Sequence, residues 1–199
     1  MLTLKERRKR GKEFRRKVGR NRHADWSAKK GRNDPVATIV AANKDRLQFL
    51  MPIKMGRMAG GPFAFFRGAA PLMAADLATL PVTGLDVQIC GDAHVHNLGA
   101  YAAPEGHLVF DINDFDETIT GPWEWDLKRL ATSLVLAGRE ASESNNVCRD
   151  GVEEMVCSYR TSMHRFAAIW PESRFVAAKE GHRCRPSCKK RVASRRYRH

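Results

Sequence analysis

The residues best suited to chemistry in this 199-residue chain lie in two neighbouring polar runs, CGDAHVHN at 90–97 and VFDINDFDE at 109–117. They combine acidic, amide and imidazole side chains, namely Asp92, His94, His96, Asn97, Asp111, Asn113, Asp114, Asp116 and Glu117. Carboxylates this close together repel one another unless a cation or water neutralises them. Oxygen ligands of this kind suit Mg²⁺, which takes one or two carboxylates together with substrate phosphates. The two runs therefore predict a magnesium site that acts on phosphates.

The spacing within the runs fits phosphoryl transfer. Asn97 lies five residues after Asp92, and Asp114 ends a hydrophobic run further along the chain. In phosphoryl transfer one carboxylate orients the attacking hydroxyl, while an Asp and an Asn hold Mg²⁺ on the nucleotide phosphates. The protein-kinase catalytic loop has the same five-residue spacing between its Asp and its Asn.

Short strands must position these side chains. The apolar run at 87–90 predicts a buried strand, and residues 91–97 form a polar loop. Residues 98–102 and 107–112 predict a hairpin around the turn at 104–106, which contains Pro and Gly. The loop and the residues that follow the hairpin are therefore expected to converge.

Helices are predicted on both sides of this unit. They cover roughly residues 34–52, 62–80, 123–139 and 152–169. Asp34-Pro35 is typical of a helix start, with Asp as N-cap and Pro in the first turn. The apolar face of the third helix is expected to use Trp123, Leu127, Leu130, Leu134 and Ala137. The predicted fold class is α+β.

Charge divides the chain into parts. Residues 1–33 carry 14 Lys and Arg against 3 acidic residues, whereas residues 34–139 carry 8 against 12. We therefore expect a basic arm at 1–33, a folded domain at 34–170 and a disordered basic tail at 171–199. His182, Cys184 and Cys188 in the tail give only a weak zinc signal, because a fourth ligand is missing.

The sequence also excludes some locations. No run approaches the roughly 18 to 20 consecutive apolar residues of a membrane-spanning helix. The start, MLTLKERRKR, has no apolar run after its charges and so does not read as a secretory signal. We expect a cytoplasmic protein with no membrane partner.

The central region resembles a known family. The runs CGDAHVHN, FDINDFDE and WEWDLKRLA are similar to the catalytic half of the aminoglycoside-phosphotransferase and kinase-like superfamily. Over about residues 22–170 the chain more closely resembles a bacterial domain of unknown function, DUF 2252. The matching runs include PFAFFRGAA at 62–70, TGLDVQICGDAHVHNLG at 83–99, LVFDINDFDET at 108–118 and GPWEWDLKRLA at 121–131.

The resemblance implies a partial protein-kinase-like fold, with Mg²⁺ and ATP as cofactors and an unidentified hydroxyl compound as acceptor. Asp92 would be the catalytic base, and Asn97 and Asp114 would hold the metal. Asp111 and Asp116 are alternative metal ligands that the sequence does not rank.

Three further residues are expected to support the loop. Asp126 would brace it by hydrogen bonds from the start of its helix, and His94 lies within it. Arg67 would reach a phosphate or a site carboxylate, or else pair with an acid such as Asp76 or Asp86.

The chain also departs from the family pattern. Family members are longer, and their later half resembles a nucleotide lobe with a Gly-rich loop and a phosphate-pairing lysine. Residues after 140 supply neither feature. We therefore expect a truncated or frameshifted member that is inactive alone.

Two other function classes stay open. His94 and His96, with Asp92 and Asp114, would suit the transition-metal site of a hydrolase. The basic segments at both ends would suit nonspecific contact with nucleic-acid phosphates. The first of these segments lacks the interleaved aromatic residues of a base-stacking surface.

Overall fold

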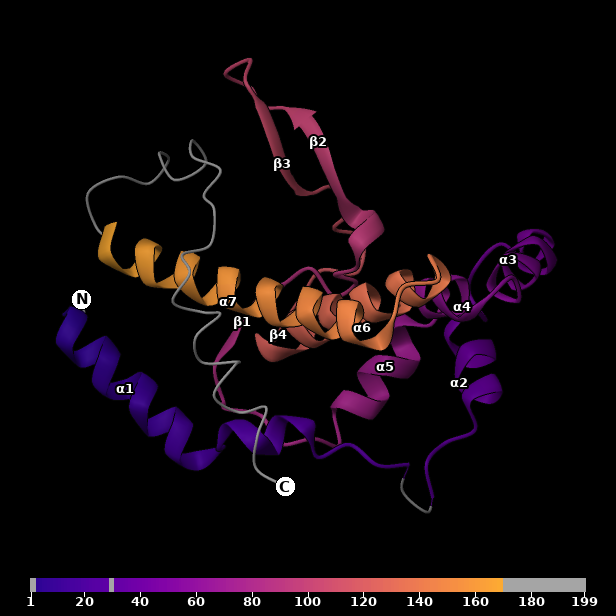
Figure 1. The fold of residues 1–199 in the computed structure, drawn as a ribbon. Coiled ribbons are helices and arrows are strands. Elements are labelled where there is room, and N and C mark those ends of the chain that lie inside the picture. The colour runs from indigo at the N-terminus through magenta and orange to yellow at the C-terminus, as the bar shows by residue number, and fades with distance from the viewer. Residues whose placement is uncertain (1–2, 29–30, 170–199) are drawn as a thin grey trace.

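The structure, a computed structural model, describes residues 3–28 and 31–169 (Figure 1). The helices before the strands are α1 (Leu4–Lys17), η1 (Arg20–Ala24), α2 (Pro35–Ala42), η2 (Gln48–Leu50), α3 (Met51–Met58), α4 (Pro62–Gly68) and α5 (Ala70–Leu77). The strands are β1 (Asp86–Ile89), β2 (Leu98–Ala102), β3 (Leu108–Ile112) and β4 (Ile119–Pro122), with η3 (Val95–Asn97) between β1 and β2. Helices α6 (Glu124–Glu140) and α7 (Asn145–Ile169) follow. The predicted α+β class is confirmed, while the predicted tail at 171–199, with its three candidate zinc ligands, lies outside the described residues.

The N-terminal segment contains a capped helix. Thr3 and Glu6 form a capping box at the start of α1, in which each side chain accepts the other residue's backbone N–H. Further along the chain, Arg32 forms a two-pronged ion pair with Asp76. Its Nε and Nη2 each donate to one carboxylate oxygen of Asp76, at 2.7 Å. This pair joins the end of the segment to α5.

The helix predicted over 34–52 is shorter in the structure. Its start is as expected, because Asp34 accepts a hydrogen bond from the N–H of Ala37 at 2.8 Å. It ends at Asn43, whose side chain donates to the carbonyl of Ile39 and thereby competes with the helical pattern. Pro52 does not end a helix but lies in the first turn of α3, where its missing N–H costs nothing.

The helix predicted over 62–80 is likewise two helices. The chain bends at Ala69, between α4 and α5, and Pro71 lies in the first turn of α5. The small core is built from these short helices: Ile39, Met58, Ala69 and Leu72 pack together. Among the described residues, no helix combines the length and the apolar character needed to cross a bilayer.

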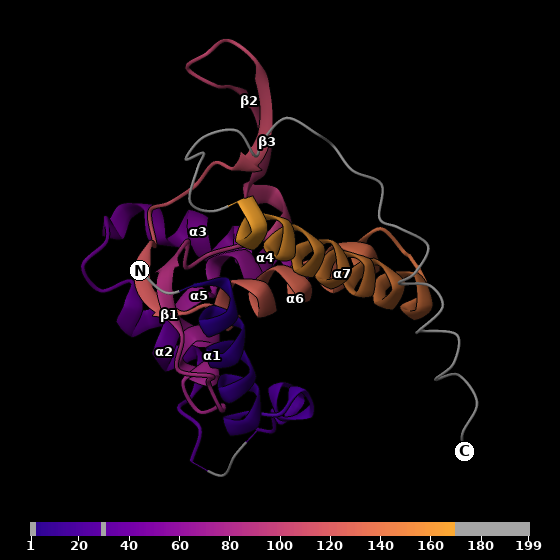
Figure 2. The ribbon, with the colours of Figure 1, turned by 90° about the vertical axis from the view of Figure 1, so that its left-hand side faces the viewer.

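Two antiparallel strand pairs follow the helices. The expected hairpin of β2 and β3 projects away from the helices in both ribbon views (Figures 1 and 2). Strand β1 pairs with β4, in a register that places Ile89 opposite Ile119. Strand β4 was not predicted, because it has only four residues and the last two, Gly121 and Pro122, are typical of turns.

Helices α6 and α7 lie side by side and pack against each other (Figures 1 and 2). Gly138 permits this approach, since a Cβ there would lie 2.7 Å from the sulfur of Cys148. Trp123 stacks on Tyr159 of α7 with ring centroids 6.1 Å apart, so its role is packing. Helix α7 begins at Asn145, earlier than predicted.

Candidate active site

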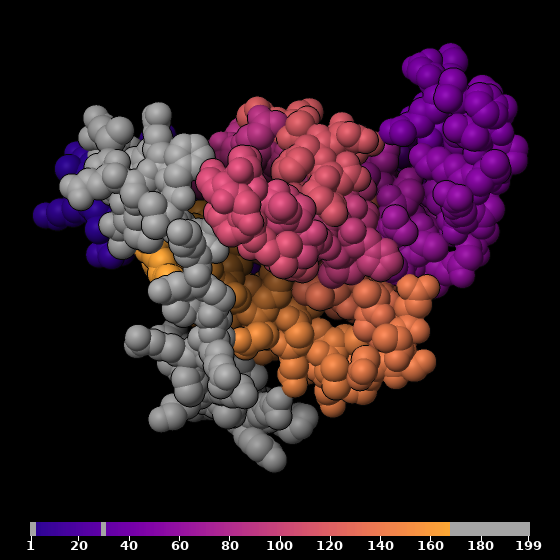
Figure 3. Space-filling model, turned by 90° about the horizontal axis from the view of Figure 1, so that it is seen from above, coloured from indigo at the N-terminus to yellow at the C-terminus, as the bar shows by residue number. Residues whose placement is uncertain are grey.

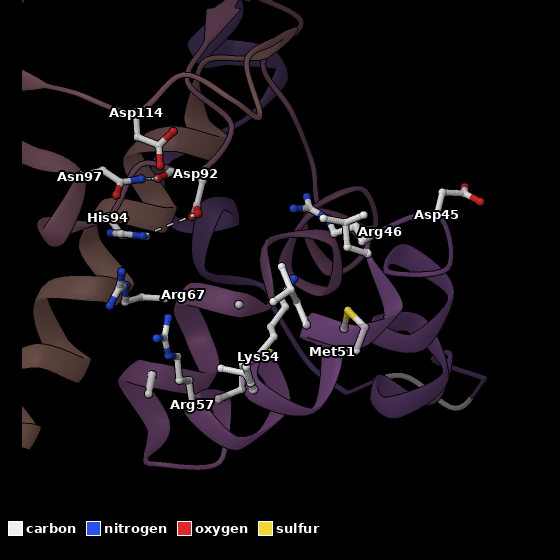
Figure 4. Close-up of a pocket in the computed structure, with 16 residues that line it drawn as sticks. Asp45, Arg46, Met51, Lys54, Arg57, Arg67, Asp92, His94, Asn97 and Asp114 are labelled. Carbon is white, nitrogen blue, oxygen red and sulfur yellow. Dashed lines mark hydrogen bonds and ion pairs between the residues drawn. The ribbon is translucent and has the colours of Figure 1, made fainter.

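Five of the eight predicted site residues line a cavity of about 960 Å³ (Figure 4). Asp92, His94, Asn97 and Asp114 line one side, which we call the acidic wall. The other side is lined mainly by residues of η2, α3 and α4. In the space-filling view from above, the purple surface of that segment and the pink surface of the hairpin lie next to each other (Figure 3). Two runs separated in sequence therefore meet in one cavity.

Asp92 is held by a buried arginine. Its Oδ1 accepts a short hydrogen bond from Nε of Arg129, a side chain that is 3% exposed. Arg129 also donates to the carbonyl of Phe66 at 2.9 Å and lies over the Phe66 ring. The second carboxylate oxygen of Asp92 lies 3.6 Å from Nε2 of His94 (Figure 4). One oxygen of Asp92 is thus fixed, and the other is left for the cavity.

One face of α6 holds the whole loop. Asp126 accepts hydrogen bonds from the N–H groups of Cys90 and Gly91 at 2.7 and 3.0 Å, which are contacts of the kind expected for it. Arg129, three residues after Asp126, donates to the carboxylate of Asp92. Ser133, four residues after Arg129, accepts a hydrogen bond from the N–H of Val95 at 3.1 Å. Residues spaced at three and four lie on one side of a helix. The helix thus contacts the loop in sequence order.

Arg129 and Ser133 were missing from the predicted site. The buried residues of α6 are Glu124, Arg129 and Ser133, all polar, whereas the predicted apolar face is only half-buried. The predicted apolar residues are thus partly buried, while the most deeply buried side chains of α6 are polar, because this helix also packs against backbone N–H groups that need partners. The signal that would have found Arg129 is its spacing from Asp126 and Ser133.

Gly91 gives the loop its shape. Its φ of +85° lies in the left-handed region that favours glycine. A Cβ at this position would also overlap the backbone carbonyl of Glu117. The close approach of the loop to the segment after the hairpin therefore requires glycine here.

The two expected metal ligands face the cavity beside Asp92. Asn97 is buried, and its amide nitrogen donates to the backbone carbonyl of Asp92 at 3.0 Å. This bond orients the amide and leaves its oxygen available. Asp114 is exposed, and one of its carboxylate oxygens accepts from the N–H of Asp116 at 3.3 Å. Asn97 and Asp114 are therefore oxygen donors that suit Mg²⁺.

The alternative ligands lie elsewhere. Asp111 is exposed on β3 and accepts from the N–H of Ile112, and Asp116 is exposed beyond the hairpin. Neither residue lines the cavity. Of the three candidate aspartates in this run, only Asp114 does so.

Arg67 also lines the cavity, and its predicted pairing is wrong. Asp76 is occupied by Arg32, and Arg67 forms no hydrogen bond or ion pair with any residue in the described part of the chain, Asp86 included. The reason is position: Arg67 lies in the last turn of α4 on the cavity side, exposed and close to His94.

His94 is buried and packs among aromatic rings. Burial lowers the pKa of His94, and the charges of Arg129, Arg67 and His96 lower it further, while Asp92 acts in the opposite direction. His96 packs edge-on against Phe63 at 4.7 Å between ring centroids. Within residues 3–28 and 31–169, no three His, Cys, Asp or Glu side chains converge as a metal-binding group. His94 and His96 both pack against Phe63, and the hydrolase alternative stays a prediction.

The comparisons with known proteins give a family. Residues 46–198 match the model of a family described as an uncharacterized protein conserved in bacteria, DUF2252. The matched region begins later than the predicted resemblance over residues 22–170, and it extends further, to residue 198. Comparison with curated proteins and with solved structures gives no match. Since the matched region covers most of the sequence, the chain belongs to the DUF2252 family.

Proposed function

We propose that the cavity is a kinase-like phosphotransferase site, in which the γ-phosphoryl group of ATP passes to a hydroxyl group. One observation carries the proposal: Asp92, Asn97 and Asp114 line a single cavity although they come from two separate runs. Their residue types are those that phosphoryl transfer requires. The kinase-like superfamily and the truncation stay predictions from the resemblance. The proposal departs from the expectation that the chain is inactive alone, because the three residues meet in a cavity that this chain forms by itself.

Asp92 is the base in this proposal. Arg129 holds one carboxylate oxygen, so the other is oriented to accept the proton of an attacking hydroxyl. His94 beside it is uncharged near neutral pH because burial lowers its pKa. The uncharged ring leaves that oxygen of Asp92 without a competing ion pair.

Asn97 and Asp114 would hold Mg²⁺. The hydrogen bond from the amide nitrogen of Asn97 leaves its oxygen free, and Asp114 adds one carboxylate. Such a site needs few protein ligands, because substrate phosphates and water supply the rest. Bound there, Mg²⁺ would neutralise charge on the transferring phosphoryl group. Asp111 and Asp116 are left out because they do not line the cavity.

The test is ATP hydrolysis by the full chain, with water as the acceptor. Asp92→Asn removes the proton acceptor and should lower the Mg²⁺-dependent rate by about 100-fold or more. Asp86→Asn, an exposed aspartate on β1, is the matched control and should leave the rate unchanged. An Asp92→Asn rate equal to that of the wild type, or no Mg²⁺-dependent hydrolysis by the wild type, contradicts the proposal.

A further inference from the structure

The cavity has a second, cationic side. Arg46, Lys54, Arg57 and Arg67 all line it, opposite the acidic wall (Figure 4). Lys54 and Arg57 come from α3 and Arg67 from α4, and all four cations precede the 90–97 loop in sequence. We call Lys54, Arg57 and Arg67 the basic wall.

Two of these cations have no side-chain partner within residues 3–28 and 31–169. Arg46 pairs with Glu117 at 3.0 Å, and Lys54 donates to the side-chain oxygen of Asn43 at 2.6 Å. The side chains of Arg57 and Arg67, by contrast, form no hydrogen bond or ion pair with any residue that the structure describes. Both side chains are exposed to the cavity and free to turn toward a ligand.

The positive charges on this side of the cavity are close enough to affect one another. Burial lowers the pKa of Lys54, and the positive charge of Arg46 lowers it further, although Glu117 opposes this. The positive charge of Arg67 likewise lowers the pKa of His94. In Figure 4 Arg67 lies between Arg57 and His94. Like charges gathered at one cavity wall repel one another, so an anion that enters between them is stabilised.

The chemistry of the guanidinium group narrows the choice of anion. Arginine presents a planar fork of N–H donors that matches the oxygens of a phosphate group, and two adjacent forks suit an anion of charge two or more. Leu47, Leu50 and Ile53 line the same cavity and offer apolar surface beside the cations. A ligand with both a phosphate and an apolar part therefore fits this side.

We propose that Arg57 and Arg67 form a phosphate-binding site, which holds a phosphate group of a substrate against the acidic wall. The inference deepens the proposed function and rests on it for the reaction that follows binding. The site takes either the polyphosphate of the nucleotide or the phosphate of a phosphorylated acceptor. Its two cations come from α3 and α4.

The test is calorimetric titration of the full chain with inorganic pyrophosphate in the absence of Mg²⁺. Arg57→Gln and Arg67→Gln should each weaken binding at least tenfold, whereas Arg160→Gln, an exposed arginine of α7, should not. All three variants should keep the wild-type melting temperature, because the three side chains are exposed. Equal pyrophosphate affinity in the wild type and both cavity variants overturns the inference, and assigns binding to the basic residues elsewhere.

Two further titrations separate the sources of the phosphate and the two proposals. If saturating Mg²⁺ and ATP abolish pyrophosphate binding, the site belongs to the nucleotide; if binding persists, it belongs to a phosphorylated acceptor. Asp114→Asn should leave pyrophosphate binding intact without Mg²⁺. Arginine-dependent pyrophosphate binding without any ATP hydrolysis would support the phosphate site and contradict the phosphotransferase.

Discussion

The two walls of the cavity are built differently. On the acidic wall, helix α6 holds the 90–97 loop through Asp126, Arg129 and Ser133. On the basic wall, Arg57 and Arg67 protrude from α3 and α4 with no partner among the described residues. Carboxylates fixed in advance need little reorganisation during a reaction. Unpaired cations favour the entry of an anion, so the first wall is suited to chemistry and the second to binding.

The largest effect should come from breaking the acidic wall at Arg129. Arg129→Met leaves Asp92 without its buried partner and should lower the free energy of unfolding by about 3–5 kcal/mol. Urea unfolding followed by tryptophan fluorescence measures this. Arg160→Met, at an exposed position of α7, is the matched control and should change stability by less than about 0.5 kcal/mol. A loss below about 1 kcal/mol for Arg129→Met would mean that the wall is not braced by this residue.

Gly91 and Gly84 form a matched pair for the shape of the loop. Both have positive φ, +85° and +81°, but only Gly91 lies against another segment, at Glu117. Gly84→Ala should cost about 1 kcal/mol from backbone strain alone. Gly91→Ala adds overlap with Glu117 and should cost about 3 kcal/mol in all. Equal losses in chemical denaturation would show that the close approach of the two segments does not constrain the loop.

Asp126 should matter less than Arg129, because it satisfies two backbone N–H groups rather than a buried charge. Asp126→Asn weakens its bonds to Cys90 and Gly91 and should lower the free energy of unfolding by about 2 kcal/mol. The same unfolding experiment with Asp86→Asn, on β1, gives the baseline for an exposed aspartate. The account of α6 as the support of the loop fails if the two variants behave alike.

The part of the site that could be predicted from sequence is the part carried by residue type and spacing. Asp92, Asn97 and Asp114 stand out because carboxylates and an amide at that spacing have few structural reasons to occur together. The hairpin and the start of α2 could also be predicted, because turn residues and the Asp34-Pro35 pair determine the backbone conformation of their immediate neighbours. These features depend on neighbours within a few residues.

What could not be predicted depends on distant partners. Arg129 holds Asp92 from 37 residues away, and β4 exists only because β1 lies beside it. The break after Ala42 depends on how Asn43 turns back on its own helix, which composition does not reveal. One alternative for Arg67 was a pair with Asp76, but Arg32 occupies that carboxylate. Tertiary pairing thus decided all of these cases except the break after Ala42, which is local.

The smallest effect concerns pH and His94. Its pKa is below its ordinary value of 6.5 in the folded chain, so the unfolded chain binds more protons around that pH. The stability that this provides is complete above about pH 6.5 and is lost as the pH falls through the lowered pKa. The charged and titratable groups that act on His94 are Asp92, Arg129, Arg67 and His96. Unfolding from pH 7.5 to pH 5 should show a steeper decline for the wild type than for His94→Gln, and parallel curves would contradict this.

The most direct test of the account is a set of thermal melts with and without Mg²⁺ and ATP, followed by near-ultraviolet circular dichroism. A Mg²⁺–nucleotide site predicts that ATP with Mg²⁺ raises the melting temperature of the wild type, with a stabilisation of about 2.7 kcal/mol at 100 times the dissociation constant. Asp114→Asn should lose the part of the shift that needs Mg²⁺, whereas Asp111→Asn, outside the cavity, should keep it. A wild-type melt that Mg²⁺ and ATP leave unchanged, or an equal shift in Asp114→Asn, would contradict the account.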